Sequence, residues 1–173
     1  GLAMAGDRCV AEIQFCDYIY NTIDLLKLAG NACWSTAGDY NLPMTVMTPV
    51  GSGIRGSIYH SHSFDATATH IPGWKIVMPS TPLDAYGLMI SCMREENPTM
   101  YLKPKALLRV RGEDQIPGEP ELTREGDKKL KEMIDKPVQG DSSKWKPKWP
   151  DGLTDFSIPI GKAKIVHEGN QVT

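Results

Sequence analysis

The sequence lacks any run of about 18 apolar residues, the length that a membrane-spanning helix needs. No basic segment precedes the small apolar residues at its start, so the pattern of a secretory signal peptide is missing too. The formal net charge is only −2, which leaves no positive excess to bind a polyanion. These absences argue against a membrane partner and a nucleic-acid partner, and they predict a cytoplasmic protein.

Paired cysteines and internal repeats are missing as well. The four cysteines are scattered and form no Cys-x-x-Cys pair: Cys9, Cys16, Cys33 and Cys92. This spacing is typical of small hydrophobic side chains in a reducing compartment. A chain of 173 residues is long enough for one α/β domain with its own core, with or without part of a second domain.

Segments of strand character alternate with segments of helical periodicity over residues 1–109. We predict strands at 9–14, 44–48, 74–78 and 99–102, and helices at 15–29, 64–70 and 82–94. Gly30 is expected to end the first helix, and Pro49 the second strand. Thr81 precedes a proline and an acidic residue, which is typical of a helix N-cap. The alternation predicts an α/β fold, with a mainly parallel sheet flanked by helices.

The composition changes in the last third of the chain. Residues 110–157 mix prolines with dense charge and predict an irregular linker, with one helix at 123–134. Trp145 and Trp149 are expected to anchor this linker to a neighbouring surface. Strand character returns over residues 158–166, and a hairpin turn is expected at 168–170, so we expect a second domain to begin with residues 158–173.

The most informative stretch is a glycine-rich segment, residues 51–63, directly after the second predicted strand. Three glycines within six positions permit a left-handed backbone and close approach to another group. Ser63 is expected to be the N-cap of the next helix. A strand, a glycine-rich turn and a helix build binding sites at the carboxyl edge of parallel sheets. Arg55 and His60 are the chemistry-bearing residues of this turn.

The residues alone leave several roles open. An imidazole at His60 suits hydrogen bonding or proton transfer near neutral pH, although a loop histidine can also satisfy backbone groups. His62 and His70 could join it around a metal ion, but they complete no recognised zinc spacing, so a zinc site is disfavoured. Arg55 could form a salt bridge or bind an anion. Tyr18 could pack in the core or stack on a flat ligand.

Several motifs occur in one order along the chain. They are Glu12-Ile13-Gln14-Phe15-Cys16-Asp17-Tyr18-Ile19, Thr48-Pro49-x-Gly51-x-Gly53, Tyr59-His60-Ser61, Pro72-Gly73-Trp74-Lys75-Ile76-Val77-Met78-Pro79-Ser80-Thr81-Pro82, Leu102-Lys103-Pro104-Lys105 and Ile158-Pro159-Ile160-Gly161-Lys162-Ala163. Together they resemble the beta subunit of the thiamine-diphosphate-dependent 2-oxo acid dehydrogenases, of the pyruvate or branched-chain type. No single motif is decisive, but several in register make chance similarity improbable.

The resemblance implies a domain organisation and a set of partners. Residues 1–109 would be most of a transketolase-like pyrimidine-binding domain, residues 110–157 a linker longer than usual in the family, and residues 158–173 the start of a C-terminal domain. The diphosphate and its magnesium ion would be held by an alpha subunit in an alpha2beta2 heterotetramer. A lipoyl acyltransferase core would accept the acyl group. The family's cofactor-activating glutamate would lie upstream of Gly1, so we expect this chain alone to be inactive.

The resemblance also implies roles for individual residues. His60 would face the cofactor near the substrate carboxylate, and an aromatic ring would stack on the aminopyrimidine. Tyr18 matches that ring best, and Phe15 is the second candidate, with core packing as its alternative. Arg55 would lie on the substrate side. Five residues match positions that enclose a structural potassium ion through backbone carbonyls: Met44, Thr45, Cys92, Glu95 and Asn97.

The expected function is therefore oxidative decarboxylation of a 2-oxo acid, with transfer of the acyl group to a lipoyl carrier. Two alternatives remain open, namely another thiamine enzyme of the transketolase family and a non-catalytic α/β interaction module. The 2-oxo acid itself cannot be read from the residues. A eukaryotic source would place the protein in the mitochondrial matrix.

Overall fold

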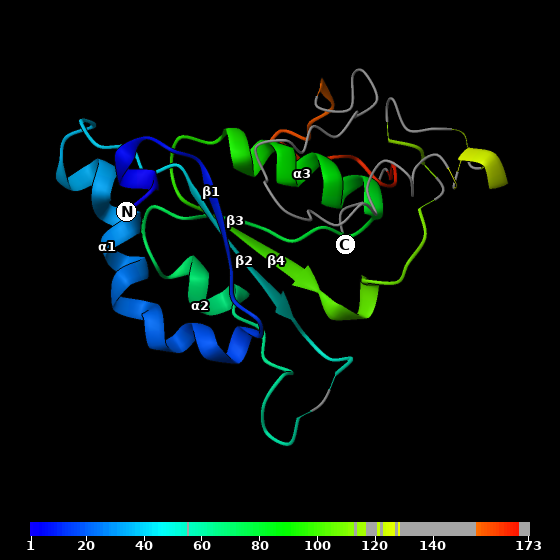
Figure 1. Cartoon of the computed structure of the whole chain (residues 1–173), viewed down its shortest axis with the longest axis horizontal. Helices are drawn as coiled ribbons and strands as arrows, with labels where there is room; N and C mark the ends of the chain where they lie inside the picture. The colour runs from blue at the N-terminus through cyan, green and yellow to red at the C-terminus, as the bar shows by residue number, and fades with distance from the viewer. Residues whose placement is uncertain are drawn as a thin grey trace, which may run out of the picture.

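A computed structural model describes residues 1–54, 56–112, 114–116, 121, 123–126, 128 and 155–169. Its centre is a four-stranded, fully parallel sheet with the strand order β1-β2-β4-β3 (Figure 1). The strands are β1 (Cys9–Glu12), β2 (Met44–Val50), β3 (Lys75–Val77) and β4 (Thr99–Pro104). The predicted α/β fold with a parallel sheet is confirmed.

Helical segments connect these strands. They are η1 (Ala3–Ala5), η2 (Cys16–Thr22), α1 (Ile23–Ser35), α2 (Asp65–Thr69), α3 (Pro82–Arg94) and η3 (Lys105–Leu107). The first crossover runs through η2 and α1, the second through α2 and the third through α3. Helices α1 and α2 cover one face of the sheet, and α3 covers the other (Figure 1).

The alternation of side chains along the strands divides the core between these two faces. On β4, Met100 and Leu102 are buried in the larger cluster, toward α1 and α2. Tyr101 lies between them in sequence and belongs to the smaller cluster, with Cys92 of α3. The Tyr101 hydroxyl donates a hydrogen bond to the carbonyl oxygen of Ala85 at 2.8 Å, and burial raises its pKa to about 12.

The first helix does not end at Gly30 as predicted. It begins as the 3₁₀ turns of η2 and continues as α1 to Ser35. Gly30 lies inside α1 because a neighbouring segment passes very close: a Cβ atom there would lie 2.1 Å from the carbonyl oxygen of Pro72. Trp74 holds the same two segments together, since its Nε1 donates a hydrogen bond to the carbonyl oxygen of Leu26 in α1 at 2.7 Å. This glycine therefore serves close packing, not helix termination.

Pro49 does not end β2, which continues to Val50. The carbonyl oxygen of Met47 accepts from Ile13 beside β1, so by alternation the nitrogen of Pro49 also faces the β1 side. Because β1 ends at Glu12, no strand lies there to need the missing N–H. The proline is tolerated for that reason.

Two helix starts were predicted, and one is confirmed. The hydroxyl oxygen of Thr81 accepts the N–H of Asp84 at 3.0 Å, as an N-cap does. The prediction of Ser63 as the N-cap is wrong. A cap at Ser63 would start α2 at Phe64, but α2 starts at Asp65, and Phe64 is the cap residue without a side-chain capping bond. The cap residue Phe64 is fully buried, and its ring meets the ring of Tyr20 edge-on with the centroids 5.3 Å apart.

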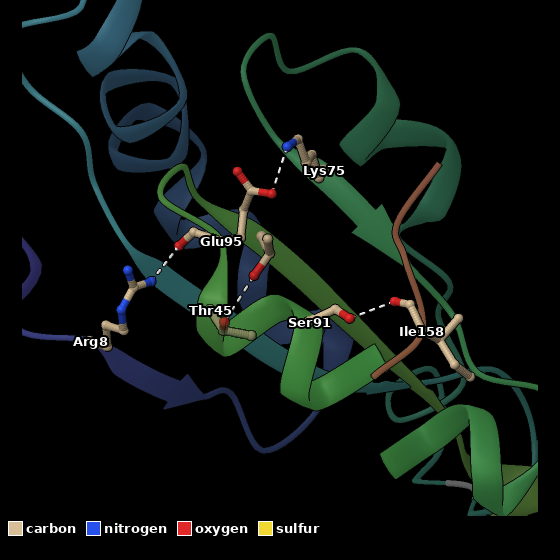
Figure 2. Close-up of polar contacts among 7 residues, drawn as sticks. Arg8, Thr45, Lys75, Ser91, Glu95 and Ile158 are labelled. Carbon is tan, nitrogen blue, oxygen red and sulfur yellow. Dashed lines mark hydrogen bonds and ion pairs between the residues drawn. The ribbon is translucent and has the colours of Figure 1, made fainter. Parts of the chain in front are cut away.

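Residues 156–160 lie along α3. No strand forms over residues 158–166, which contradicts the prediction. Instead the N–H of Ile158 donates to the carbonyl oxygen of Gly87 at 3.1 Å, and the hydroxyl of Ser91 donates back to Ile158 (Figure 2). Gly87 makes room for this segment, since a Cβ there would lie 2.7 Å from Phe156 and Ile158 side-chain atoms.

Several predictions fall mainly outside the described residues. Within the predicted linker helix at 123–134, residues 124–126 and 128 are helical, residue 123 forms a bend, and the others lie outside the described residues. Trp145 and Trp149 also lie outside the described residues, so their anchoring role stays a prediction. The division into three segments at residues 109 and 157 therefore stays a prediction.

Candidate functional site

The glycine-rich loop, residues 51–63, leaves the carboxyl end of β2 and returns to α2 (Figure 1). Its base is closed by a hydrogen bond from the N–H of Gly51 to the carbonyl oxygen of His62, at 3.0 Å. A second pair of bonds, at 3.1 and 2.9 Å, joins Gly56 and Tyr59 farther out. The predicted turn at the carboxyl edge of the sheet is therefore present.

His60 has an unusual backbone. Its φ is +74°, a left-handed value that costs free energy in a residue with a Cβ atom. Such outliers persist only where the surrounding contacts hold them, and they are enriched at functional sites. The conformation brings the imidazole of His60 inward, where it stacks on the ring of Phe15 with the two centroids 3.8 Å apart and an interplanar angle of 27°.

Three of the predicted site residues therefore meet in an aromatic cluster, formed by Phe15, Tyr18 and His60. The Tyr18 ring meets His60 edge-on, with centroids 6.0 Å apart, and about two fifths of Tyr18 is exposed. Phe15 lies outside the buried core, so its contact with His60 replaces the expected core role. These residues come from the loop and from the segment after β1, two connections at the same sheet edge.

The imidazole of His60 has one nitrogen that lacks a partner. Its Nδ1 is buried and has no hydrogen bond to any residue in the described part of the chain. On the other edge of the ring, Gly56 packs so closely that a Cβ there would lie 2.2 Å from Cδ2 and 2.7 Å from Nε2. A buried polar atom without a partner is uncommon in native proteins, and it marks a place where a ligand group can bind.

Sequence reasoning missed Lys105, the residue that supports this cluster. It directly follows β4, is 8% exposed, and donates from Nζ to the carbonyl oxygen of His60. The same Nζ lies 5.6 Å from the centroid of the Phe15 ring. No sequence signal pointed to it: Lys105 lies near the loop because β4 is the neighbour of β2 in the sheet, and this strand order comes from the fold.

Asp17 and His62 form a second polar pair beside the cluster. His62 Nε2 lies 3.6 Å from Asp17 Oδ1, and the Asp17 side chain is only 2% exposed. Neither carboxylate oxygen of Asp17 has a hydrogen bond among the described residues. No group of three or more His, Cys, Asp or Glu residues in that part of the chain is placed to hold a metal ion, which gives the zinc alternative no support.

A comparison with protein-family models identifies the family of this domain. The model of the transketolase pyrimidine-binding domain matches residues 1–111, which include the whole sheet and the aromatic cluster. The chain belongs to this family.

Comparisons with individual proteins indicate a narrower group of relatives than the domain family does. The 2-oxoisovalerate dehydrogenase subunit beta of Pseudomonas aeruginosa is 36% identical over 174 residues, which cover all of this chain and 44% of that protein. The subunit of the same name from Bacillus subtilis is 37% identical, with 42% of its length covered. The pyruvate dehydrogenase E1 component subunit beta of Acholeplasma laidlawii is 30% identical, again with 42% covered. This chain thus spans less than half the length of these relatives.

One of the predicted potassium ligands, Glu95, directly follows the carboxyl end of α3 (Figure 2). There the guanidinium of Arg8 donates to the carbonyl oxygens of Met93 at 3.0 Å and Glu95 at 2.9 Å. The carbonyl oxygen of Cys92 accepts the N–H of Glu95. A potassium ion at Glu95 would have to displace a side-chain cation, so these residues do not fit the ion without movement of Arg8. The potassium site stays a prediction.

Other members of that predicted set have partners of their own. The hydroxyls of Thr45 and Thr99 are 2.8 Å apart across β2 and β4, and Lys75 Nζ lies 2.6 Å from the Glu95 carboxylate (Figure 2). Burial alone would raise the pKa of Glu95, but the hydrogen bond and charge of Lys75, with backbone N–H groups, bring that pKa below its usual range.

Two further observations delimit the site. Arg55 lies outside the described residues, so its substrate-side role stays a prediction. A cavity of about 450 Å³ lies between α3 and the chain that follows β4, with Tyr86 and Leu108 in its lining. This cavity contains none of the aromatic cluster, and we do not assign the site to it.

Within the described residues no helix is both long and apolar enough to cross a membrane.

Proposed function

We propose that this chain supplies the pyrimidine half of a thiamine diphosphate site in the beta subunit of a 2-oxo acid dehydrogenase. The observation that carries the proposal is the aromatic cluster of Phe15, Tyr18 and His60 at the carboxyl edge of the sheet. The family match and the printed names of the relatives favour this function over a transketolase or a non-catalytic module.

The described residues fit an aminopyrimidine ring. Tyr18 is partly exposed and offers an aromatic surface to a flat heterocycle. His60 Nδ1 is buried and lacks a hydrogen bond among the described residues, so a polar ligand atom can become its partner. When bound, thiamine diphosphate supplies the carbanion chemistry for decarboxylation of a 2-oxo acid.

The chain's own residues then have distinct tasks. Phe15 supports one face of the His60 imidazole, and Gly56 leaves room along its edge. His60 donates a hydrogen bond or holds a proton at Nδ1, next to the substrate carboxylate. Tyr18 positions the pyrimidine. Arg55 is proposed to bind an anionic substrate group at the entrance.

The remaining parts of the reaction belong to partners. We propose that an alpha subunit holds the diphosphate and its magnesium ion, in an alpha2beta2 heterotetramer. A lipoyl acyltransferase core accepts the acyl group. The expected location is the cytoplasm, or the mitochondrial matrix in a eukaryote.

Oxidative decarboxylation by the full-length protein tests this function. The beta subunit is co-expressed with its alpha subunit and assayed with thiamine diphosphate, magnesium and a lipoyl domain. Pyruvate and 3-methyl-2-oxobutanoate are offered separately, which also identifies the substrate class. We expect acylation of the lipoyl domain with at least one of them. A correctly assembled complex that acylates with neither, and with no other branched 2-oxo acid, contradicts the proposal.

A further inference from the structure

Lys105 is a buried lysine at the edge of the candidate site. Only 8% of the residue is exposed, although an ammonium group is costly to bury without partners. None of the ion pairs among the described residues involves Lys105. Its Nζ instead donates to the carbonyl oxygen of His60, 45 positions earlier in the chain. A charge-assisted hydrogen bond of this kind is stronger than one between neutral groups.

The glycine-rich loop rests on the same side chain. A Cβ atom at Gly53 would lie 3.4 Å from Lys105 Cβ, so this part of the loop passes close to the lysine. At the other end of the side chain, Nζ lies 5.6 Å from the centroid of the Phe15 ring. Lys105 therefore binds the carbonyl oxygen of His60 and lies close to Gly53 at the start of the loop and to the Phe15 ring.

The backbone of His60 needs such a support. Its left-handed φ of +74° is unfavourable for a residue with a Cβ atom, so a contact must hold it. The other loop hydrogen bonds of the described residues join Gly51 to His62, Gly56 to Tyr59, and Ser61 to Ile54. Among the hydrogen bonds of the described residues, the bond from Lys105 is the one that reaches the carbonyl oxygen of His60.

We propose that Lys105 is a positioning residue of this site. Its ammonium group fixes the peptide of His60 and so keeps the imidazole stacked on Phe15, with Nδ1 turned to the inside. Lys105 acts through His60 and is not itself required to touch the cofactor. This inference rests on the proposed function for its role in the reaction, while the geometry that it explains is independent of the reaction.

A matched control lies two residues earlier. Lys103 is on β4, just before Lys105, and its ammonium group pairs with the exposed carboxylate of Glu12 instead of a loop carbonyl. Lys103→Met therefore removes one lysine of β4 without touching His60. Lys105→Met removes the ammonium group but keeps the length of the buried stem, and Lys105→Arg restores a cationic donor.

The first measurement is the chemical reactivity of His60 in the full-length beta subunit assembled with its alpha subunit. Diethyl pyrocarbonate is the probe, and mass spectrometry of peptides measures its addition to each histidine. Exposed His70 serves as the internal standard. We expect Lys105→Met to speed addition at His60 by about tenfold relative to His70, the factor that corresponds to the loss of one charge-assisted hydrogen bond. Lys105→Arg and Lys103→Met should react at nearly the rate of the unmodified protein.

The second measurement separates positioning from binding. Lys105→Met should lower kcat for lipoyl acylation and change the concentration of thiamine diphosphate needed for half-maximal activity only slightly, and Lys105→Arg should recover much of the rate. An unchanged His60 reactivity in an assembled Lys105→Met complex overturns the inference. If Lys105→Met fails to assemble, Lys105→Gln decides, because it keeps a polar side chain but removes the charge. A tenfold increase in its His60 reactivity supports the inference, whereas unmodified reactivity together with full activity overturns it. An inactive but well-assembled unmodified complex contradicts the proposed function alone, since the reactivity measurement still tests Lys105.

Discussion

The imidazole of His60 lies on the ring of Phe15, with the two centroids 3.8 Å apart, although 45 positions separate these residues in the chain. Phe15 follows β1 and His60 lies in the loop after β2, so the contact exists because these two strands are parallel neighbours. The sheet thus carries two distant motifs to one edge, where parallel α/β folds bind their ligands.

The first prediction concerns His60. We expect His60→Asn in the assembled full-length complex to lower acylation of the lipoyl domain by about a hundredfold or more, because a group that donates or holds a proton contributes on that scale. Binding of thiamine diphosphate, measured by calorimetry, should change little. Asparagine is chosen because it tolerates the left-handed backbone better than alanine.

His70→Asn is the control for this change. His70 is exposed at the end of α2 and lies outside the aromatic cluster, so the rate should be that of the unmodified complex. Unmodified rates in His60→Asn would refute the role proposed for this histidine.

The sequence predicts the features that depend on residues close together in the chain, and it does not predict those that depend on residues far apart in the chain. The start of α3 could be predicted because Thr81, Pro82 and Asp84 act on one another within a single turn. The end of α1 could not, because Gly30 responds to the distant Pro72. Pro49 was misread in the same way: its tolerance in β2 depends on where β1 ends.

The candidate site shows the same division. His60 and Tyr18 could be proposed from the motifs that contain them, and the structure brings them together. Lys105 was missed because its motif gives no hint that its ammonium group reaches a carbonyl oxygen 45 positions away. The left-handed backbone of His60 was missed too, since φ depends on the contacts that hold the loop.

The second prediction tests the close approach at Gly30. A Cβ atom there would lie 2.1 Å from a carbonyl oxygen of the backbone, which cannot move away without shifting the whole segment. Gly30→Ala should therefore destabilise the protein by about 3 kcal/mol. Gly38→Ala is the control, because its φ of +92° entails strain but no atom of the described residues lies within 4 Å of an added Cβ, and we expect a loss of about 1 kcal/mol. Thermal unfolding of the full-length subunit measures both; equal losses would contradict the packing argument.

The third prediction compares two hydroxyl residues at helix starts. Thr81→Ala removes an N-cap acceptor from α3 and should cost about 1 kcal/mol of stability. Ser63→Ala should stay within about 0.5 kcal/mol of the unmodified protein, because Ser63 is exposed and does not cap α2. Urea unfolding of the two variants under identical conditions is the measurement. A larger loss in Ser63→Ala would restore Ser63 as the cap.

The fourth prediction concerns acid stability at the same helix start. The hydrogen bond from the Ser80 hydroxyl, with help from Thr81, lowers the pKa of Asp84. A depressed carboxyl pKa stabilises the fold above the pKa of the unfolded chain, about 3.9, and this contribution is lost as the pH falls through the lower folded-state pKa. Ser80→Ala should therefore lower stability at pH 6 but converge with the unmodified protein in strong acid. A constant difference from pH 6 down to pH 2 would contradict the linkage.

The last prediction concerns Cys16, which lies beside Asp17 beneath the aromatic cluster. Burial, and next the charge of Asp17, raise the pKa of the Cys16 thiol to about 11, while the charge of Lys105 opposes them. At pH 8 only about one thiol in a thousand would be the reactive thiolate. Iodoacetamide should therefore label Cys16 roughly a hundredfold more slowly in the folded subunit than in guanidinium chloride, as mass spectrometry of its peptide would show. If the two rates were equal, Cys16 would be accessible to solvent, and the segment that carries Phe15 and Tyr18 could not be packed as described.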